Sequence, residues 1–364
     1  MPKRLGRLTA ALVALIAGLS APARGATPPS AAAYRWRLPV GFPRPCVPED
    51  NPMTEAKVAL GRRLFYERRL SGNGTQSCAS CHRPERAFTD GRGRAVGSTG
   101  APHPRGSMSL ANVAYGVSLT WVDAHQTTLE GQQLGPMLNR DPVELGLSGL
   151  EDEAIARLAA DPGYAAAFAD AFPGEPIDLT AVRRAIASFE RTLLSGGSAY
   201  DRWVWQDDRT ALSAAARRGM ALFFSSRLGC KDCHGGFTFS GPVAFDLDVG
   251  GVPPDPPAFV DTGLGGSFKA PTLRNVSVTG PYMHDGRFTK LEQVIDYYAS
   301  GGGASPGRSP RIRGFAISES ERRDLVAFLE SLTDEAFLSD PRFSDPGGPS
   351  REPSRETPGG AGGR

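Results

Sequence analysis

Two short motifs of cysteine and histidine carry the clearest chemical signal in the sequence. In each, two cysteines are separated by two residues and a histidine follows directly: Cys78, Cys81 and His82 in "CASCH", and Cys230, Cys233 and His234 in "CKDCH". Two thiols at this spacing can add to the two vinyl groups of one haem, and the adjacent histidine can then ligate the iron. The motifs therefore predict two covalently bound c-type haems.

Other uses of paired cysteines fit the spacing less well. A zinc ribbon places its two pairs about 15 to 20 residues apart, whereas these pairs lie in different halves of the chain. A thioredoxin-like dithiol needs one pair in a βαβ setting and no histidine. The fifth cysteine, Cys46 in "RPCVP", is expected to be a buried free thiol or an intermolecular one, and we assign it no role.

Composition places the chain among ordinary globular proteins. It has 364 residues, 41 Lys and Arg against 39 Asp and Glu, and a hydrophobic fraction of 40%, which is typical of about two domains. The near-neutral charge gives no reason to expect nucleic acid. Residues 1–25 combine a basic head, an apolar run and small residues, so we predict a cleaved secretory signal, a periplasmic location and no membrane span after cleavage. An uncleaved anchor is the alternative, although the apolar run is short for a span of ~20 residues.

An internal repeat surrounds the two motifs. "GRRLFYERRLSGNGTQSCASCH" begins at Gly61 and "GMALFFSSRLGCKDCH" at Gly219, and both run from Gly-x-x-Leu-Phe through a loop to the haem motif. The repeat predicts a mainly α fold with two cytochrome c-like haem domains and long irregular loops. The predicted segments are a signal (1–25), an N-terminal extension (26–53), the first haem domain (54–200), the second with a closing helix (201–344) and a disordered tail (345–364).

Helical periodicity supports this organisation. The stretch "AVRRAIASFERTLL" places apolar residues on one face at three-and-four spacing, namely Val182, Ile186, Phe189 and Leu193. In "ISESERRDLVAFLESL", Ser318 and Glu321 form a predicted capping box, ahead of a stripe of Leu325, Phe328, Leu329 and Leu332. The Gly- and Pro-rich segment 249–267 is expected to form loop rather than strand.

The haem motifs together with "FERTLLSGGSAYDRW" and "FKAPTLRNVSVTGPYMHDGRFTKLEQVIDYY" resemble the bacterial dihaem cytochrome c peroxidase and MauG superfamily over about residues 54–338. Within it, "GSTGAPHPRGSMSLANVAY" and "LTW" are most similar to the MbnH group, dihaem enzymes that oxidise a tryptophan on a partner protein. The resemblance implies a five-coordinate haem on His82, where peroxide binds. It implies a six-coordinate haem on His234 that stores or relays oxidising equivalents.

The resemblance extends to the distal residues of the first haem. "TLEGQQLGPMLNRDPVELG" resembles the family's distal segment and implies catalytic roles for Gln132 and Glu144, with Arg140 and Asp141 as a two-residue insertion. Glu144 would move a proton between the peroxide oxygens, and burial beside a haem should raise its pKa. The alternative is that Glu144 caps a turn and Gln132 faces solvent. His103 lies in the loop where conventional peroxidases carry a histidine that blocks the first haem, and we expect it to be a surface residue.

Two further features are implied between the haems. Trp121 matches the family's tryptophan that passes oxidising equivalents from one haem to the other, with an ordinary core tryptophan as the alternative. A calcium ion lies between the haems in relatives, and Thr279 and Pro281 match two of its ligands. Gly106 stands where the family has asparagine, so another oxygen must complete the six to eight that calcium prefers.

Tyr298 is implied as the second axial ligand of the His234 haem. In "LEQVIDYY" it shares a helical face with apolar residues, while Tyr297 lies about 100° around the helix and is the fallback ligand. Conventional dihaem peroxidases carry methionine at the matching position and the MauG group carries tyrosine. The alternative is a core tyrosine whose hydroxyl is satisfied elsewhere.

Three functions are compatible with these features. The first is an exported oxidase that uses hydrogen peroxide to form high-valent haem iron and oxidises a residue, expected to be Trp, of a periplasmic partner protein. The second is a conventional cytochrome c peroxidase that takes electrons from a small cytochrome or cupredoxin. The third is a non-catalytic dihaem electron carrier, which would need Met137 and Met283 as distal ligands.

Overall fold

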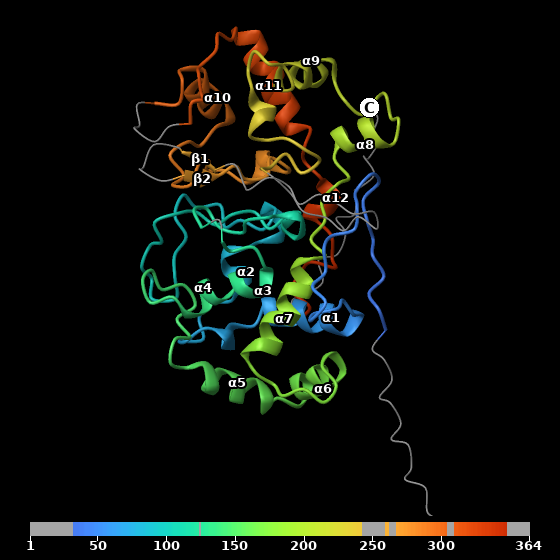
Figure 1. Ribbon diagram of the computed structural model, residues 1–364, viewed down its shortest axis with the longest axis vertical. Coiled ribbons are helices and arrows are strands. Elements are labelled where there is room, and N and C mark those ends of the chain that lie inside the picture. The colour runs from blue at the N-terminus through green and yellow to red at the C-terminus, as the bar shows by residue number, and fades with distance from the viewer. Residues whose placement is uncertain (1–31, 124, 242–258, 262–266, 304–308, 348–364) are drawn as a thin grey trace, which may run out of the picture. The chain divides into compact units, whose positions relative to one another are not determined.

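The computed structural model describes residues 32–123, 125–241, 259–261, 267–303 and 309–347, so the predicted signal and most of the predicted tail lie outside the described residues. Helices and irregular loops dominate these residues, and the predicted mainly α class is confirmed (Figure 1). The α-helices are α1 (Glu55–Phe65), α2 (Cys78–Cys81), α3 (Leu129–Gln132), α4 (Leu134–Leu138), α5 (Glu151–Ala159), α6 (Pro162–Ala171), α7 (Leu179–Glu190), α8 (Ala199–Trp205), α9 (Ala214–Phe223), α10 (Leu291–Ala299), α11 (Glu319–Glu330) and α12 (Glu335–Leu338). Short 3₁₀ helices are η1 (Arg68–Leu70), η2 (Pro84–Arg86), η3 (Val113–Tyr115), η4 (Cys230–Asp232) and η5 (Val276–Val278).

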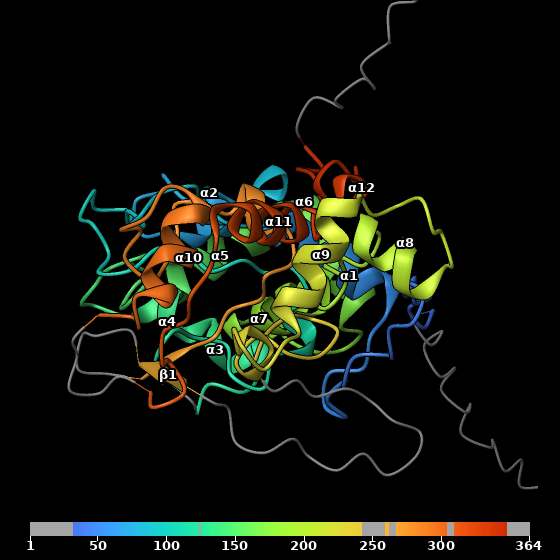
Figure 2. The same cartoon turned by 90° about the horizontal axis from the view of Figure 1, so that it is seen from above.

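The glycine of each Gly-x-x-Leu-Phe repeat lies at a helix crossing. Helix α1 packs along α7, and α9 packs along α11, which itself lies between α9 and α10 (Figure 2). A Cβ atom on Gly61 would lie 1.9 Å from the carbonyl oxygen of Ala185, and one on Gly219 would lie 1.9 Å from that of Asp324. The repeat therefore specifies a close helix crossing just before each haem motif.

Gly219→Ala should destabilise the protein by about 1–3 kcal/mol, because the added methyl group meets backbone rather than a movable side chain. Gly135→Ala in α4 is the control, since its Cβ would approach no atom closer than 3.7 Å outside its own turn. The control should be neutral or slightly stabilising, because alanine is the better helix former. Urea midpoints measure both variants, and equal midpoints would contradict the crossing argument.

Two hydrophobic clusters hold these helices. The first gathers side chains of α1, α5, α6 and α7, and the second those of α9, α10 and α11. Phe337 and Phe343, which follow α11, belong to the first cluster, with ring centroids 5.9 and 6.3 Å from that of Phe88. These two residues lie within the segment 201–344, which is predicted as the second domain, yet they pack in the first cluster. The division into two domains stays a prediction.

The structure contains the capping box and the buried apolar faces that the sequence predicts for α7 and α11. The Ser318 hydroxyl accepts the Glu321 backbone N–H at 3.2 Å, and the Glu321 carboxylate accepts the Ser318 N–H at 2.9 Å. This confirms the predicted capping box of α11. The four predicted apolar residues of α11 and its C-terminal turn are buried, as are those of α7 and its C-terminal turn.

Two strands correct the loop predicted for 249–267. β1 (Phe259–Asp261) pairs antiparallel with β2 (Ser267–Lys269), with Val260 opposite Phe268. Aromatic and β-branched residues favour strands. These two short runs were not predicted as strands because the many Gly and Pro residues around them indicate loop. The remainder of that segment lies outside the described residues. The β2 backbone is also anchored, since the Lys269 N–H donates to the carbonyl of Trp121 at 2.9 Å.

A buried ion pair fixes the segment that follows β2. The Arg274 guanidinium donates to both Asp201 carboxylate oxygens at 2.7 and 2.8 Å, and both side chains are fully buried. Its Nε donates to the carbonyl of Phe237 at 2.7 Å. The pair therefore links α8 to the loop that carries Pro271, which contacts the second haem motif.

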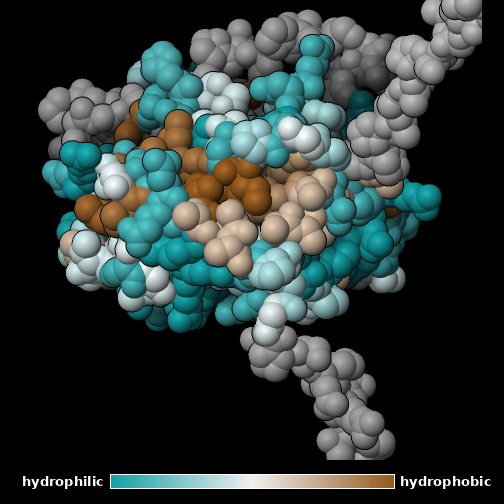
Figure 3. Space-filling model, turned by 90° about the horizontal axis from the view of Figure 1, so that it is seen from below, coloured by the Kyte–Doolittle hydropathy of each residue, from teal (hydrophilic) through white to brown (hydrophobic). Residues whose placement is uncertain are grey.

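The surface features bear on two expectations. No helix in the described part of the chain combines the length and apolar character needed to cross a bilayer. Seen from below, hydrophilic residues surround a smaller group of hydrophobic ones (Figure 3).

Cys46 is exposed, so the prediction of a buried free thiol is wrong. Its alternative, an intermolecular thiol, stays a prediction.

Candidate active site

The first cysteine motif forms a single helical turn that ends at histidine. Ser77 and Ser80 cap α2 reciprocally, so Cys78 and Cys81 follow one another on one turn and His82 follows at its C-terminus. The His82 Nδ1–H donates to the carbonyl of Phe88 at 2.7 Å. Because a carbonyl can only accept, the proton lies on Nδ1 and Nε2 carries a free lone pair. Metal-binding histidines typically have this arrangement.

The second motif repeats the same geometry. Cys230 begins η4, and the His234 Nδ1–H donates to the carbonyl of Pro271 at 3.1 Å. Burial lowers the pKa of both His82 and His234, so both rings are held neutral, as a metal ligand must be. The two motifs thus present matching thiol pairs and imidazole Nε2 atoms.

A cavity of about 420 Å³ opens over the second motif. Its volume lies in the range of cofactor sites, roughly 300–1,000 Å³. Its wall brings together the following sequence-predicted residues: Trp121, Cys230, Cys233, His234, Thr279, Pro281 and Tyr298. The cavity, the two thiols and the neutral imidazole of His234 fit a covalently bound haem.

Tyr298 reaches this cavity from α10. Burial and the neighbouring Cys233 and Cys230 raise the pKa of its phenol. The side chain is part-buried in the wall of the cavity, and no hydrogen bond joins its hydroxyl to another residue that the structure describes. Tyr297 is not among the cavity-lining residues, and its ring contacts Phe288 at a centroid distance of 5.4 Å. Of the two adjacent tyrosines, Tyr298 is therefore the one positioned to meet a group bound in the cavity, whose wall also includes Tyr282.

Trp121 lies at the edge of the same cavity. Its indole Nε1–H donates to the carbonyl of Gly106 at 2.8 Å, and its ring packs edge-on to His284 with centroids 6.5 Å apart. His284 in turn stacks on Phe268 at 4.1 Å. The tryptophan is thus fixed by β2 and Gly106, and it is exposed to the cavity rather than enclosed in a hydrophobic core.

The predicted calcium ligands also line this cavity. Thr279, Pro281 and Gly106 occur together in its wall. The described residues contain no group of three or more His, Cys, Asp or Glu side chains that could hold a metal ion. A calcium ion here would therefore depend on carbonyl and hydroxyl oxygens, which calcium accepts.

The distal segment folds back on itself and brings Glu144 toward the first motif. The Leu145 N–H donates to the carbonyl of Pro136 at 2.8 Å, while Arg140 and Asp141, the two-residue insertion, are exposed at the turn. Burial raises the pKa of Glu144. Burial is the main cause that raises the pKa of Cys78 and Cys81, and the charge of Glu144 adds to it, so the carboxyl lies near the first thiol pair.

Gln132 is the last residue of α3 and is half-buried, whereas the next residue, Gln133, is buried. The Gln133 amide donates to the Glu190 carboxyl at 3.3 Å, and its own carbonyl oxygen is buried without a partner in the described structure. Burial raises the pKa of Glu190 to about 8. Sequence reasoning missed this pair, although Glu190 lies four residues after Ile186 on the inward face of α7.

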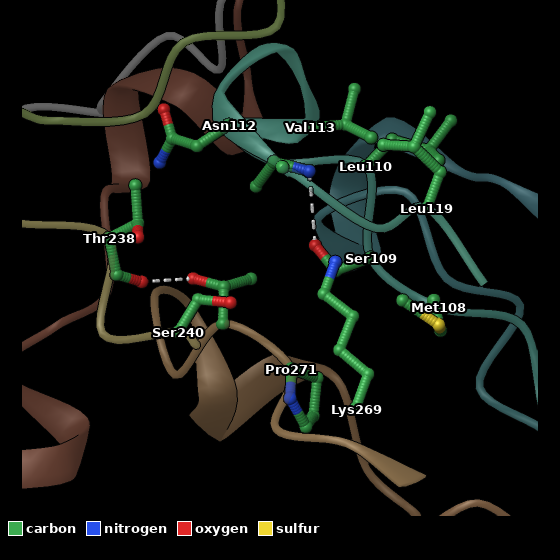
Figure 4. Close-up of a pocket in the computed structure, with 13 residues that line it drawn as sticks. Met108, Ser109, Leu110, Asn112, Val113, Leu119, Thr238, Ser240, Lys269 and Pro271 are labelled. Atoms are coloured by element: carbon green, nitrogen blue, oxygen red, sulfur yellow. Dashed lines mark hydrogen bonds between the residues drawn. The ribbon is translucent and has the colours of Figure 1, made fainter. Parts of the chain in front are cut away.

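Two other polar residues are less exposed than the sequence indicates, namely Lys269 and His103. The ammonium of Lys269, on β2, donates to the carbonyl of Ser118 at 2.6 Å, and burial lowers its pKa to about 8. Lys269 lines both the large cavity and a small one of about 40 Å³ between residues 108–119 and 238–272 (Figure 4). His103, predicted as a surface residue, has a side chain only 20% exposed, with Nε2 3.8 Å from the Glu144 carboxylate.

Sequence comparison decides the family. A family model described as di-haem cytochrome c peroxidase matches residues 55–209. The chain is 41% identical over 305 residues to the methylamine utilization protein MauG of Methylorubrum extorquens, covering 82% of this chain and 83% of that protein. The chain belongs to the dihaem cytochrome c peroxidase and MauG family.

Two further relatives agree with this assignment. A cytochrome-c peroxidase of Denitromonas iodatirespirans is 35% identical over 361 residues, covering 87% of this chain and 93% of that protein. A solved MauG-like protein associated with microbial copper homeostasis is 40% identical with a TM-score of 0.80, covering 86% of this chain and 99% of that one. This member of the dihaem peroxidase and MauG family is a dihaem peroxidase-type oxidoreductase, and the resemblance inferred from the motifs is confirmed.

Proposed function

We propose that this chain is an exported enzyme that uses hydrogen peroxide to oxidise a residue of a partner protein, with tryptophan as the expected target. The observation that carries this proposal is the position of Tyr298 in the wall of the 420 Å³ cavity, which also contains the motif of Cys230 and His234. The Tyr298 hydroxyl has no hydrogen-bond partner among the described residues. Export is proposed from residues 1–25, and the partner from the likeness to MauG-type proteins.

The two motifs would hold the haems. Each thiol pair would form the thioether links, and the Nε2 atoms of His82 and His234 would ligate the irons. When bound, the haems supply the irons at which peroxide is cleaved and the sites that hold the oxidising equivalents. Lys269 supports this assignment, because a buried ammonium without a carboxylate among the described residues needs a counter-charge, which a haem propionate would provide.

Glu144 would move a proton at the first haem. Its carboxylate would accept a proton from one peroxide oxygen and return it to the other, so that water leaves. Gln132, at the end of α3, would orient the peroxide with its amide. Trp121, fixed between Gly106 and β2, would relay oxidising equivalents between the two sites, and Thr279 and Pro281 would contribute oxygens to a calcium ion.

Tyr298 would set the chemistry of the second haem. A phenolic oxygen favours oxidised iron, whereas a methionine thioether favours ferrous iron and suits the uptake of electrons from a small donor. The second candidate function, conventional cytochrome c peroxidase activity, is favoured by the 35% identity to a protein of that name. The residue at position 298 separates the two candidates.

Carbon monoxide tests whether the first site is open. The reduced protein should bind carbon monoxide at the His82 haem, because the proposed distal residues Gln132 and Glu144 are not iron ligands. The measurement is the optical difference spectrum of the reduced protein with and without the gas. Complete absence of binding would mean that both haems are closed, as in an electron carrier, and would contradict both enzyme functions.

A further inference from the structure

The loop that carries His103 is fixed against the segment that carries Glu144. The Ser98 N–H donates to the Glu144 backbone carbonyl at 2.7 Å, and the His103 N–H donates to the carbonyl of Ala95, also at 2.7 Å. A Cβ atom on Gly97 would lie 1.9 Å from the carbonyl oxygen of Val143, so only glycine permits this approach. The loop and the distal segment are therefore held as one unit.

The backbone also selects the tautomer of His103. Its Nδ1 accepts the Arg105 backbone N–H at 3.1 Å. An accepting nitrogen carries no proton, so the neutral ring carries its proton on Nε2. That nitrogen lies 3.8 Å from the Glu144 carboxylate. This separation is longer than a hydrogen bond, and a small rotation of the carboxylate would shorten it to one.

Burial favours the neutral ring. It is the largest cause that lowers the pKa of His103, and the charge of the Arg105 guanidinium lowers it further, against a backbone contact with Arg105 that raises it. Around Glu144, burial raises the pKa of the carboxyl, and the groups that feel its charge are the thiols Cys78 and Cys81. Protonation of Nδ1 would break the bond from Arg105. His103 is therefore a fixed, uncharged N–H donor aimed at Glu144.

We propose that His103 is a positioning residue for Glu144, whose Nε2–H orients the carboxylate and stabilises its ionised form. The inference rests on the proposed proton-transfer role of Glu144. Since the Nε2 lone pair is protonated, His103 is also unable to ligate the first iron while the loop keeps this arrangement. An N–H donor to the ionised form holds a carboxyl pKa below the value that burial alone would give.

Cyanide binding to the oxidised haem protein tests the proposal without peroxide turnover. Hydrogen cyanide would bind as the anion and would give its proton to the Glu144 carboxylate, so the binding rate should follow the ionisation of Glu144. His103→Leu, which lacks the donor, should move the midpoint of this pH profile up by about one unit, which slows binding about tenfold below the midpoint. His103→Gln, which keeps a neutral N–H donor, should restore most of the wild-type profile.

Each other outcome has a distinct meaning. Unchanged profiles in both variants would overturn the role of His103 while leaving the proposed function intact. A first haem that is low-spin in the wild type and becomes high-spin in both variants would identify His103 as an iron ligand and would also overturn the inference. A wild-type protein that binds no cyanide at either haem would instead contradict the open first site and thus the proposed function. If His103→Leu does not fold, His103→Phe provides a second variant without a donor.

Discussion

Glu144→Gln should slow the reaction of peroxide with the fully oxidised protein by about 10²- to 10⁴-fold, the range attributed to a positioned general acid and base. Glutamine keeps the size and hydrogen-bonding capacity of the side chain but cannot carry a proton. The raised pKa of Glu144 supports this role, because proton transfer is most effective when the carboxyl titrates closer to the working pH. Stopped-flow absorbance, which follows the loss of the ferric spectrum, measures the rate.

Glu190→Gln is the matched control for this experiment. Glu190 is a second buried carboxyl with a raised pKa, it also influences the Cys78 thiol, and its contact with Gln133 survives in the amide variant. We expect at most a severalfold change. If Glu190→Gln abolished the reaction and Glu144→Gln did not, the two-residue insertion at Arg140 and Asp141 would have misdirected the assignment, and Glu190 would be the proton carrier.

Tyr298→His should change the spectrum of the second haem, shift its potential and abolish oxidation of the partner protein. Axial ligands move haem potentials over a range of about 0.8 V, and replacing an anionic oxygen with a neutral nitrogen favours the ferrous state. Peroxide should then react fully only after one haem has been reduced, as in a conventional peroxidase. Spectroelectrochemical titration measures the potential, and mass spectrometry of the partner measures its oxidation.

Tyr297→Phe is the control for the ligand. Tyr297 is adjacent in sequence but is not among the residues lining the cavity, so its variant should keep the wild-type spectrum and potential. A Tyr298→His protein with an unchanged spectrum would mean that Tyr298 is an ordinary buried tyrosine. The conventional peroxidase function would then replace the proposed one.

The sequence predicted those features that depend on local pattern. The two haem motifs, the capping box at Ser318 and the apolar faces of α7 and α11 are all set by residues a few positions apart. The repeat that begins at Gly61 and Gly219 was also visible. The sequence does not show why glycine is required at these positions. The carbonyl oxygens that leave no room for a Cβ atom belong to residues more than 100 positions away in the chain.

Features formed by distant segments escaped prediction. His103 lies near Glu144 because two loops about 40 residues apart in the chain lie against each other. Gln133, between α3 and α4, reaches Glu190 of α7 across a similar gap in sequence. The sequence analysis makes no prediction for Lys269, because no local pattern indicates that a single cation will be buried. The strands β1 and β2 were missed because the Gly and Pro around them dominate the composition of that segment.

The most direct test of the central claim is to count how many irons one equivalent of peroxide oxidises in the fully ferric protein. Mössbauer spectra of protein enriched in iron-57, frozen shortly after mixing, report each iron separately. We expect both irons to leave the ferric state together, because Tyr298 would let the second haem hold an oxidising equivalent. A change at the first iron alone, or a reaction only after prior reduction of one haem, would contradict the account.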